Sequence, residues 1–229
     1  MTAKVIDEPA LREKVKVFQD RFQAGKLLAE KLRNYSGQEN VLVLVVPAGG
    51  VPVGSVVAKE LSVLMDFVIV RKAQIPWNTE AGFGAVTWNG ETVLNELLVE
   101  QLGLTEEDIE ESISKAKRSI EERLRKFRGN KPMPLVKDKI IILVDDGLAS
   151  GFTMLAAVRS LRKSLPEKIV VAVPTASLGA IDLLRSEVDE IVCLNIRSGS
   201  FAVADAYESW HDLADEEVLK VIYEKKKEE

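Results

Sequence analysis

The chain has 229 residues, 46% of them hydrophobic and 29% charged, which is the composition of an ordinary globular protein. Its 14 glycines and 8 prolines are too few for a collagen-like chain or a long linker. No run approaches the roughly 18 apolar residues of a membrane-spanning helix, and charges interrupt the first twelve residues, where an export signal needs an apolar core. The single cysteine, Cys193, excludes an internal disulfide framework and a cysteine-rich metal site. The net charge of −5 gives no overall attraction to nucleic acid or to an anionic membrane, so neither partner is expected. Together these features predict a cytoplasmic protein.

The first third of the chain predicts helices alternating with apolar strands. An uninterrupted run such as Val41–Val46 is apolar on both faces, which is typical of a strand inside a parallel sheet. Apolar residues three or four positions apart, with a proline suited to the first turn, predict a helix from Pro9 to Asn34. Val51–Leu64 is a second predicted helix, and Phe67–Val70 a second buried strand.

The middle of the chain has a different character. Asn89-Gly90 separates two β-prone runs, 85–88 and 91–94, and predicts a hairpin because both turn residues need positive φ. A charged helix is predicted from Thr105 to Phe127, with Thr105 as its N-cap and Asp108 completing a capping box. A loop follows at 129–134.

Alternation then resumes to the end of the chain. The predicted strands are Lys139–Val144, Lys168–Val173 and Glu190–Leu194, and the predicted helices are Gly151–Ser164, Leu178–Ser186 and Asp215–Glu224, before a frayed tail from Lys225. This order of elements predicts an α/β fold with a doubly wound parallel sheet in a single domain, 1–229.

The segment after the strand that ends at Val144 carries the chemistry. Two acids, Asp145 and Asp146, follow the strand directly, and a loop rich in glycine and hydroxyl side chains leads into the next helix. Backbone N–H groups in such a loop, with the hydroxyls of Ser150 and Thr153, can surround a phosphate at the carboxyl end of a strand. The carboxylates would repel a phosphate, so they should face hydroxyl groups or a metal ion. A sugar phosphate fits both halves of this site.

Each half has an ordinary interpretation when taken alone. Paired aspartates at a strand end also occur in phosphate-accepting receiver domains, and glycine–serine loops before helices are common. Their order and spacing together favour the sugar-phosphate site.

The stretch from Val144 to Thr153 resembles the signature of the type I phosphoribosyltransferases, which bind 5-phosphoribosyl 1-diphosphate (PRPP). The chain is also similar from end to end to a group known as predicted phosphoribosyltransferases. The matching segments are Phe18–Arg21 with Ala24-Gly25, Pro47–Val53, Val70–Lys72, Gly84–Val86, Leu94–Glu96 and Asp215–Val218.

The resemblance implies a role for each residue of the signature. Asp145 and Asp146 would hold the ribose hydroxyls and act in catalysis, with Asp146 also a ligand of Mg²⁺. The 5′-phosphate would lie in a loop made of Gly147, Leu148, Ala149, Ser150, Gly151 and Thr153. The family fold further implies a flap at about 73–94 and a small hood at about 195–213.

A second loop, Pro47–Gly50, corresponds to the family's pyrophosphate loop. Backbone N–H groups at Ala48, Gly49 and Gly50 can bind pyrophosphate. In the resembling group the second position is usually arginine, so Ala48 removes a charge-assisted donor from the leaving-group site. Arg71 and Lys72, at the end of the next predicted strand, are candidates to supply that charge; the alternative is a solvated strand end.

Several other residues could act at such a site. Gln74–Phe83 resembles the mobile loop that covers the site in this fold, and Glu80 within it could act as acid or base. Phe201, Tyr207 and Trp210 could stack on a base, although packing inside the hood is the alternative for each. His211 is the only histidine and has no companion, and Cys193 is interpreted as a buried structural thiol.

The resemblance implies a Mg²⁺-dependent transferase. Ribose 5-phosphate would pass from PRPP to a nucleobase-like acceptor, and pyrophosphate would leave. Ala149 stands where the 6-oxopurine enzymes carry an aspartate, which disfavours a 6-oxopurine acceptor and leaves adenine- and uracil-type classes open. Two alternatives stay open: a sensor that binds PRPP or a nucleotide without turnover, which Ala48 favours, and hydrolysis of a phosphorylated sugar. A homodimer is compatible with the sequence.

Overall fold

The computed structural model describes residues 2–129 and 131–228. Its internal contacts divide the chain into two compact units. The first unit comprises Met1–Phe67, Val136–Gly151 and Ser164–Glu229, and the second comprises Val68–Leu135 and Phe152–Lys163. The predicted flap range falls within the second unit and the predicted hood range within the first.

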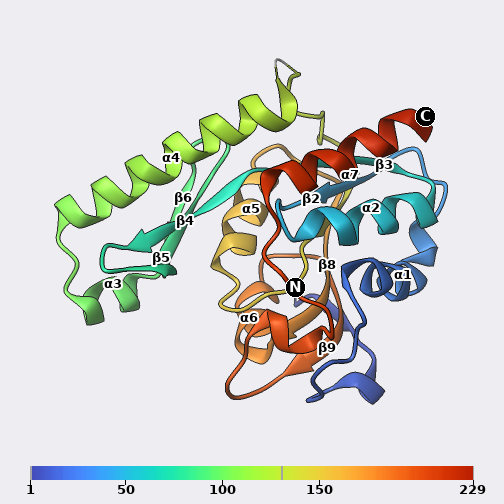
Figure 1. Ribbon diagram of the computed structural model, residues 1–229, viewed down its shortest axis with the longest axis horizontal. Coiled ribbons are helices and arrows are strands. Elements are labelled where there is room, and N and C mark those ends of the chain that lie inside the picture. The colour runs from blue at the N-terminus through green and yellow to red at the C-terminus, as the bar shows by residue number, and fades with distance from the viewer. Residues whose placement is uncertain (1, 130, 229) are drawn as a thin grey trace. The chain divides into compact units, whose positions relative to one another are not determined.

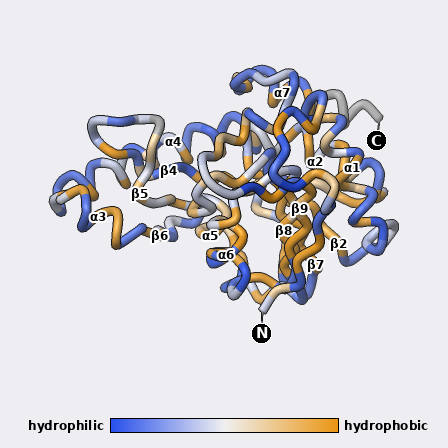
Figure 2. Tube along the Cα trace, turned by 90° about the horizontal axis from the view of Figure 1, so that it is seen from below, coloured by the Kyte–Doolittle hydropathy of each residue, from blue (hydrophilic) through white to orange (hydrophobic). Residues whose placement is uncertain are grey.

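The first unit is built on a six-stranded parallel sheet, which confirms the predicted α/β class. The strand order is β1-β9-β8-β7-β2-β3. The strands are β1 (Lys4–Ile6), β2 (Val41–Val45), β3 (Leu64–Phe67), β7 (Ile140–Val144), β8 (Lys168–Ser177) and β9 (Glu190–Arg197). Every residue of β2 and β7 is buried, as expected of strands apolar on both faces. In Figure 2 the central strands form the most hydrophobic part of the trace.

The described residues of the first unit also form the α-helices α1 (Arg21–Lys31), α2 (Gly50–Leu61), α6 (Leu178–Leu184) and α7 (Asp215–Glu228). The same residues include the short 3₁₀ helices η1 (Pro9–Leu11), η2 (Arg33–Tyr35) and η3 (Val203–Ala206). Helix α1 packs against α2, and α7 lies along α2 (Figure 1).

The second unit holds a three-stranded antiparallel sheet made of β4 (Val70–Ile75), β5 (Asn78–Thr87) and β6 (Thr92–Leu94). Its helices are α3 (Glu96–Leu102), α4 (Glu106–Arg128) and α5 (Phe152–Arg162), and α4 runs along β4 and β5 (Figure 1). The Asn89-Gly90 hairpin is confirmed, but of its two turn residues only Gly90, at φ 86°, has the positive φ expected of both. The capping box of Thr105 and Asp108 is also present. Among the described residues, no helix is both long enough and apolar enough to cross a membrane.

The helix predicted from Pro9 to Asn34 is wrong over its first half. Only a 3₁₀ turn forms at Pro9–Leu11, and α1 begins at Arg21, where the Asp20 carboxylate accepts from the N–H of Gln23 at 2.8 Å. Glu13 and Lys16 have φ values of 58° and 52°, a left-handed conformation that cannot continue a right-handed helix.

The loop predicted at Gln74–Phe83 is wrong as well, because most of it belongs to β4 and β5. Phe83 and Ala73 are fully buried and pack in one apolar cluster with Ile75 and Leu104. The alternating burial along β4 is that of a half-buried strand.

Smaller differences concern the bounds of elements. The strand expected at Phe67–Val70 is replaced by β3, which ends at Phe67, and by β4, which begins at Val70. Strands β8 and β9 extend beyond their predicted ends, β1 and α3 were not predicted, and α7 continues to Glu228 through the expected frayed tail.

Candidate functional site

The two acids of the motif lie at the carboxyl end of the parallel sheet, directly after β7. Asp145 accepts a hydrogen bond from the backbone N–H of Asp146 at 2.9 Å, and the Asp146 side chain is 13% exposed. Burial raises the pKa of Asp145 well above its usual range, and the neighbouring charge of Asp146 raises it further. Burial also raises the pKa of Asp146, although Arg21 opposes that effect.

Arg21, the first residue of α1, is a member of the site that the sequence did not reveal. Its Nε donates to Oδ2 of Asp146 at 2.8 Å, and its Nη1 donates to the carbonyl of His211 at 3.0 Å. The guanidinium carbon lies 3.8 Å from the ring centroid of Trp210, and the residue is only 6% exposed. The sole sequence signal was its position in the family-like segment Phe18–Arg21, because nothing in the chain predicts a partner 125 residues away.

The predicted phosphate loop keeps two glycines for physical reasons. A Cβ on Gly147 would lie 2.5 Å from Cγ1 of Val203, and Gly151 has a φ of 80°. Leu148 is buried, and its N–H donates to the carbonyl of Thr175 at 3.0 Å. Within the described residues no hydrogen bond engages the N–H groups of Ala149 and Ser150, which are both exposed, so these groups can donate to an anion.

The loop at residues 47–50 lies against the acid pair. The Pro47–Ala48 peptide is cis. A Cβ on Gly49 would fall 1.9 Å from Oδ2 of Asp146, and one on Gly50 would fall 2.8 Å from the carbonyl oxygen of Val144. Only glycine therefore permits this approach of the loop to the acids. The structure thus brings together two predicted parts of the site that are about a hundred residues apart in the chain.

The N–H groups of this loop are not equivalent. The N–H of Gly50 donates to the carbonyl of Val46 at 3.1 Å. It is therefore already engaged and differs from the free donor that was predicted, and what Gly50 provides is the space left by its missing side chain. No hydrogen bond in the described parts of the chain engages the N–H of Ala48 or of Gly49. Both precede the first turn of α2, where the helix dipole favours an anion.

Comparison with known proteins shows the family of the chain. A model of the phosphoribosyl transferase domain family matches residues 14–204. The chain belongs to this family. Two curated proteins, both named "Putative phosphoribosyl transferase", from Mycobacterium tuberculosis strains CDC 1551 and H37Rv, are 35% identical over 205 residues, which is 90% of this chain and 46% of theirs. The chain thus spans about half the length of these relatives. The crystal structure of TT1426 from Thermus thermophilus is 35% identical, with a TM-score of 0.73 over 90% of this chain and 98% of that one.

The remaining members of the predicted phosphoribosyl site lie in the second unit. Thr153 is in the first turn of α5, directly after the phosphate loop in the chain. Arg71 and Lys72 are on β4. Their parts in binding phosphate and pyrophosphate stay predictions.

The hood aromatics of this phosphoribosyl transferase domain pack against arginines. Tyr207 is 2% exposed, and its hydroxyl donates to the backbone carbonyl of Asp146 at 2.6 Å. Its ring lies 5.2 Å from that of Trp210, whose other partner is Arg21. Phe201 lies 5.4 Å from the guanidinium of Arg197. Each of these aromatic side chains therefore packs against neighbouring side chains. His211 forms an exposed pair with Glu217 at 2.9 Å, which gives it no place among the buried acids.

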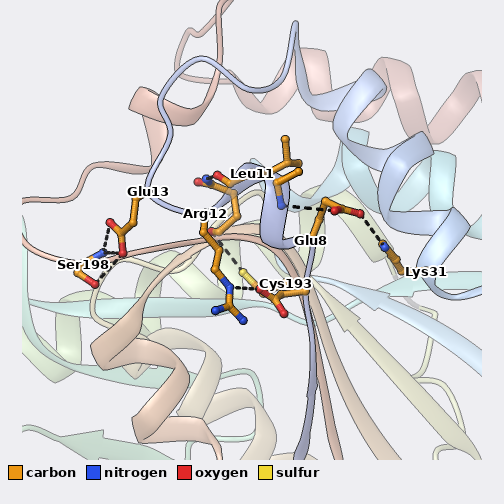
Figure 3. Close-up of polar contacts among 10 residues, drawn as sticks. Glu8, Leu11, Arg12, Glu13, Lys31, Cys193 and Ser198 are labelled. Atoms are coloured by element: carbon orange, nitrogen blue, oxygen red, sulfur yellow. Dashed lines mark hydrogen bonds and ion pairs between the residues drawn. The ribbon is translucent and has the colours of Figure 1, made fainter.

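An N-terminal segment, residues 7–16, packs against the predicted hood range (Figure 3). The buried amide of Asn195 donates to the carbonyls of Leu11 and Lys14, and the Glu13 carboxylate accepts from both the N–H and the hydroxyl of Ser198. Cys193 lies beneath this segment, and burial raises the pKa of its thiol far above the usual range. The thiol is therefore an unreactive core group, as the sequence predicted.

The donor set suits Mg²⁺ that arrives with a phosphate ligand. The described residues contain no cluster of three or more His, Cys, Asp or Glu side chains able to hold a metal. They do provide two adjacent carboxylates, Asp145 and Asp146, beside backbone groups open to anions. Mg²⁺ commonly takes one or two protein carboxylates and completes its shell with water and substrate phosphates.

Proposed function

We propose that this chain transfers ribose 5-phosphate from PRPP to a nucleobase-like acceptor and releases pyrophosphate. The observation that carries the proposal is that two turns with unengaged backbone N–H groups adjoin the acid pair. One turn, residues 147–151, follows the acids in the chain, and the other, residues 47–50, lies against Asp146. A ribose with a phosphate on one side and a diphosphate on the other has the matching order of groups.

The chain's own groups divide the work. The N–H groups of Ala149 and Ser150 hold the 5′-phosphate, and Asp145 and Asp146 accept hydrogen bonds from the ribose hydroxyls. The bond between the anomeric carbon and the diphosphate oxygen breaks, and its electron pair leaves with pyrophosphate toward the N–H groups of Ala48 and Gly49. The acceptor nitrogen forms the new bond and releases its proton to solvent. Buried carboxylates stabilise the positive charge that develops on the ribose. Mg²⁺, held by Asp146 and by the ligand's own oxygens, would neutralise the departing diphosphate.

A sensor that binds PRPP without turnover is the second candidate. Two observations favour it: Ala48 offers no side-chain donor to the leaving group, and Asp146 is already paired with Arg21.

Incubation with PRPP, Mg²⁺ and a panel of bases distinguishes the candidates. Pyrophosphate released together with a nucleotide supports the transferase. Pyrophosphate without a nucleotide indicates hydrolysis, and binding without release indicates a sensor. A folded protein that binds neither PRPP nor ribose 5-phosphate contradicts both proposals.

Replacing both Asp145 and Asp146 by Asn tests the ribose contact. We expect the calorimetric affinity for ribose 5-phosphate to fall roughly tenfold to hundredfold, the effect of losing charged hydrogen bonds of about 1.5–3 kcal/mol. Asp182→Asn, on the exposed part of α6, is the matched control and should leave the affinity unchanged. Equal affinity in the double variant and the control would contradict the assignment.

A further inference from the structure

Arg21 is a buried cation for which the proposed transfer reaction has no use so far. It holds one oxygen of Asp146, the carbonyl of His211 and one face of Trp210. Such a set of partners costs a long side chain most of its freedom and desolvates a charge. A surface arginine at the start of a helix would meet neither cost, so its position calls for a functional explanation.

The contact with Asp146 is made at the oxygen that the pyrophosphate loop approaches. Oδ2 accepts from Nε of Arg21 at 2.8 Å, and the same atom lies 1.9 Å from the place where a side chain on Gly49 would begin. Arg21, Asp146 and the loop at 47–50 therefore meet at one carboxylate oxygen. A ligand that uses this oxygen must displace the donor on Arg21 or share the atom with it.

Charge balance indicates where Arg21 would go. In the free protein its guanidinium compensates one of two adjacent buried carboxylates. A diphosphate bound at Ala48 and Gly49 brings negative charge to the same place, accompanied by a divalent cation that suits a carboxylate. If Arg21 turns from Asp146 to the diphosphate, each charge keeps a partner of opposite sign. The planar guanidinium matches phosphate oxygens well, and Ala48 supplies no side-chain donor of its own.

We propose that Arg21 is a diphosphate-binding residue that exchanges partners, holding Asp146 in the free protein and the diphosphate group in the loaded one. The inference rests on the proposed function and extends it. Because Arg21 also contacts Trp210 and the backbone of His211, the exchange links occupation of the diphosphate site to the hood.

The first test uses Arg21→Met, which keeps the length of the side chain and removes its charge. Three probes are titrated separately by calorimetry: Mn²⁺ alone, pyrophosphate with Mg²⁺, and ribose 5-phosphate alone. Without its competitor, Asp146 should bind Mn²⁺ roughly tenfold more tightly. Pyrophosphate should bind roughly tenfold to hundredfold more weakly, as for a lost charged hydrogen bond. Ribose 5-phosphate should bind as in the wild type, because the 147–151 loop is intact and Arg21 holds only Oδ2 of Asp146, which leaves Oδ1 and Asp145 for the ribose hydroxyls in both proteins.

Arg21→Lys is the conservative partner of this variant. It retains the charge without the planar guanidinium, so we expect Mn²⁺ affinity close to that of the wild type and partial recovery of pyrophosphate affinity. Unchanged Mn²⁺ and pyrophosphate affinities in folded Arg21→Met protein would overturn the proposal and leave Arg21 a structural residue.

A second measurement keeps Arg21 in place and does not depend on the folding of that variant. In protein with Trp77→Phe and Trp88→Phe, Trp210 is the remaining tryptophan, and its emission reports on the guanidinium 3.8 Å from its ring. Pyrophosphate with Mg²⁺ should shift the emission, and ribose 5-phosphate alone should not. No shift at saturating pyrophosphate overturns the exchange. Failure of the wild type to bind either ligand would instead contradict the proposed function.

Discussion

Buried charges gather at both ends of the parallel sheet in the first unit, and the two clusters are built differently. At the amino end, Lys168 donates to Glu190 at 2.8 Å and to the hydroxyl of Tyr35 at 2.6 Å, and Tyr35 contacts Glu190 at 3.1 Å. At the carboxyl end, Asp145 accepts from the N–H of Asp146, and Asp146 accepts from Arg21.

The causes of the pKa shifts differ between the two clusters. Burial alone would lower the pKa of Lys168, but its bonds to Glu190 and Tyr35 outweigh burial and raise it, which marks a cation satisfied by its partners. At the carboxyl end, burial raises the pKa of Asp145 and Asp146 in spite of Arg21. The groups of the amino-end cluster satisfy one another, whereas Arg21 does not fully compensate the burial of the two carboxyl groups at the carboxyl end. We therefore infer that the first cluster stabilises the fold and that the second is available for binding.

Breaking the amino-end cluster should have the largest effect on stability. Glu190→Ala leaves Lys168 and Tyr35 without their common partner in a largely buried place. We expect the free energy of unfolding to fall by about 3 kcal/mol, as for a buried pair that loses one member, with ligand affinity unchanged. Urea unfolding measures the change. Glu111→Ala, at an exposed helical pair, is the control and should unfold like the wild type. Equal midpoints for the two variants would show that the cluster is not stabilising.

Gly49→Ala, which fills the space between the predicted pyrophosphate loop and Asp146, should weaken ligand binding. Ala at position 49 would place its Cβ 1.9 Å from Oδ2 of Asp146, so the carboxylate or the loop must move. We expect the affinity for pyrophosphate with Mg²⁺ to fall about a hundredfold, which corresponds to about 2.7 kcal/mol. Gly179→Ala, whose nearest neighbour would be Oγ of Ser177 at 4.0 Å, should leave calorimetric affinity intact. Unimpaired binding by the Gly49 variant would remove this loop from the site.

The smallest expected effect is a gain in stability, and its sign distinguishes the carboxyl-end cluster from the amino-end cluster. Asp145→Asn removes a buried charge and keeps the oxygen that accepts from the N–H of Asp146, so it should stabilise the free protein by about 1 kcal/mol at pH 7. Because the folded-state pKa of Asp145 is raised, the folded protein binds more protons than the unfolded chain, and wild-type stability falls as pH rises above about 3.8.

The gain from Asp145→Asn should therefore vanish near pH 3 and grow toward neutrality. Thermal unfolding in the presence of a chelator, across this pH range, tests it. Destabilisation at pH 7 would mean that the acid pair is as well satisfied as the amino-end cluster.

The elements that the sequence predicted well are those specified by near neighbours. The apolar run before Val144, the Asn89-Gly90 turn and the capping box at Thr105 each depend on a few consecutive residues. The helix expected from Pro9 failed because contacts with distant residues override its periodicity. The Lys16 N–H donates to the carbonyl of Asp205, and Asn195 holds the carbonyls of Leu11 and Lys14.

The predicted loop at Gln74–Phe83 failed for a related reason. The segment resembles a mobile loop in sequence, but alternate positions of the two strands turn inward. Ala73, Ile75 and Phe83 are buried together with Leu104, a residue well beyond the hairpin in the chain. Composition alone does not distinguish such half-buried strands from a mobile segment.

By itself, the sequence determined the parallel α/β core, because runs apolar on both faces alternate with helices. It also determined the acids at the end of β7 and the glycine loop that follows them, because these residues are consecutive in the chain. Only the tertiary structure decided which groups face those acids. Arg21 reaches Asp146 across 125 positions, and Gly49 must lack a side chain because of that same carboxylate. Compensation of a buried charge depends on distances in space, which a linear pattern does not encode.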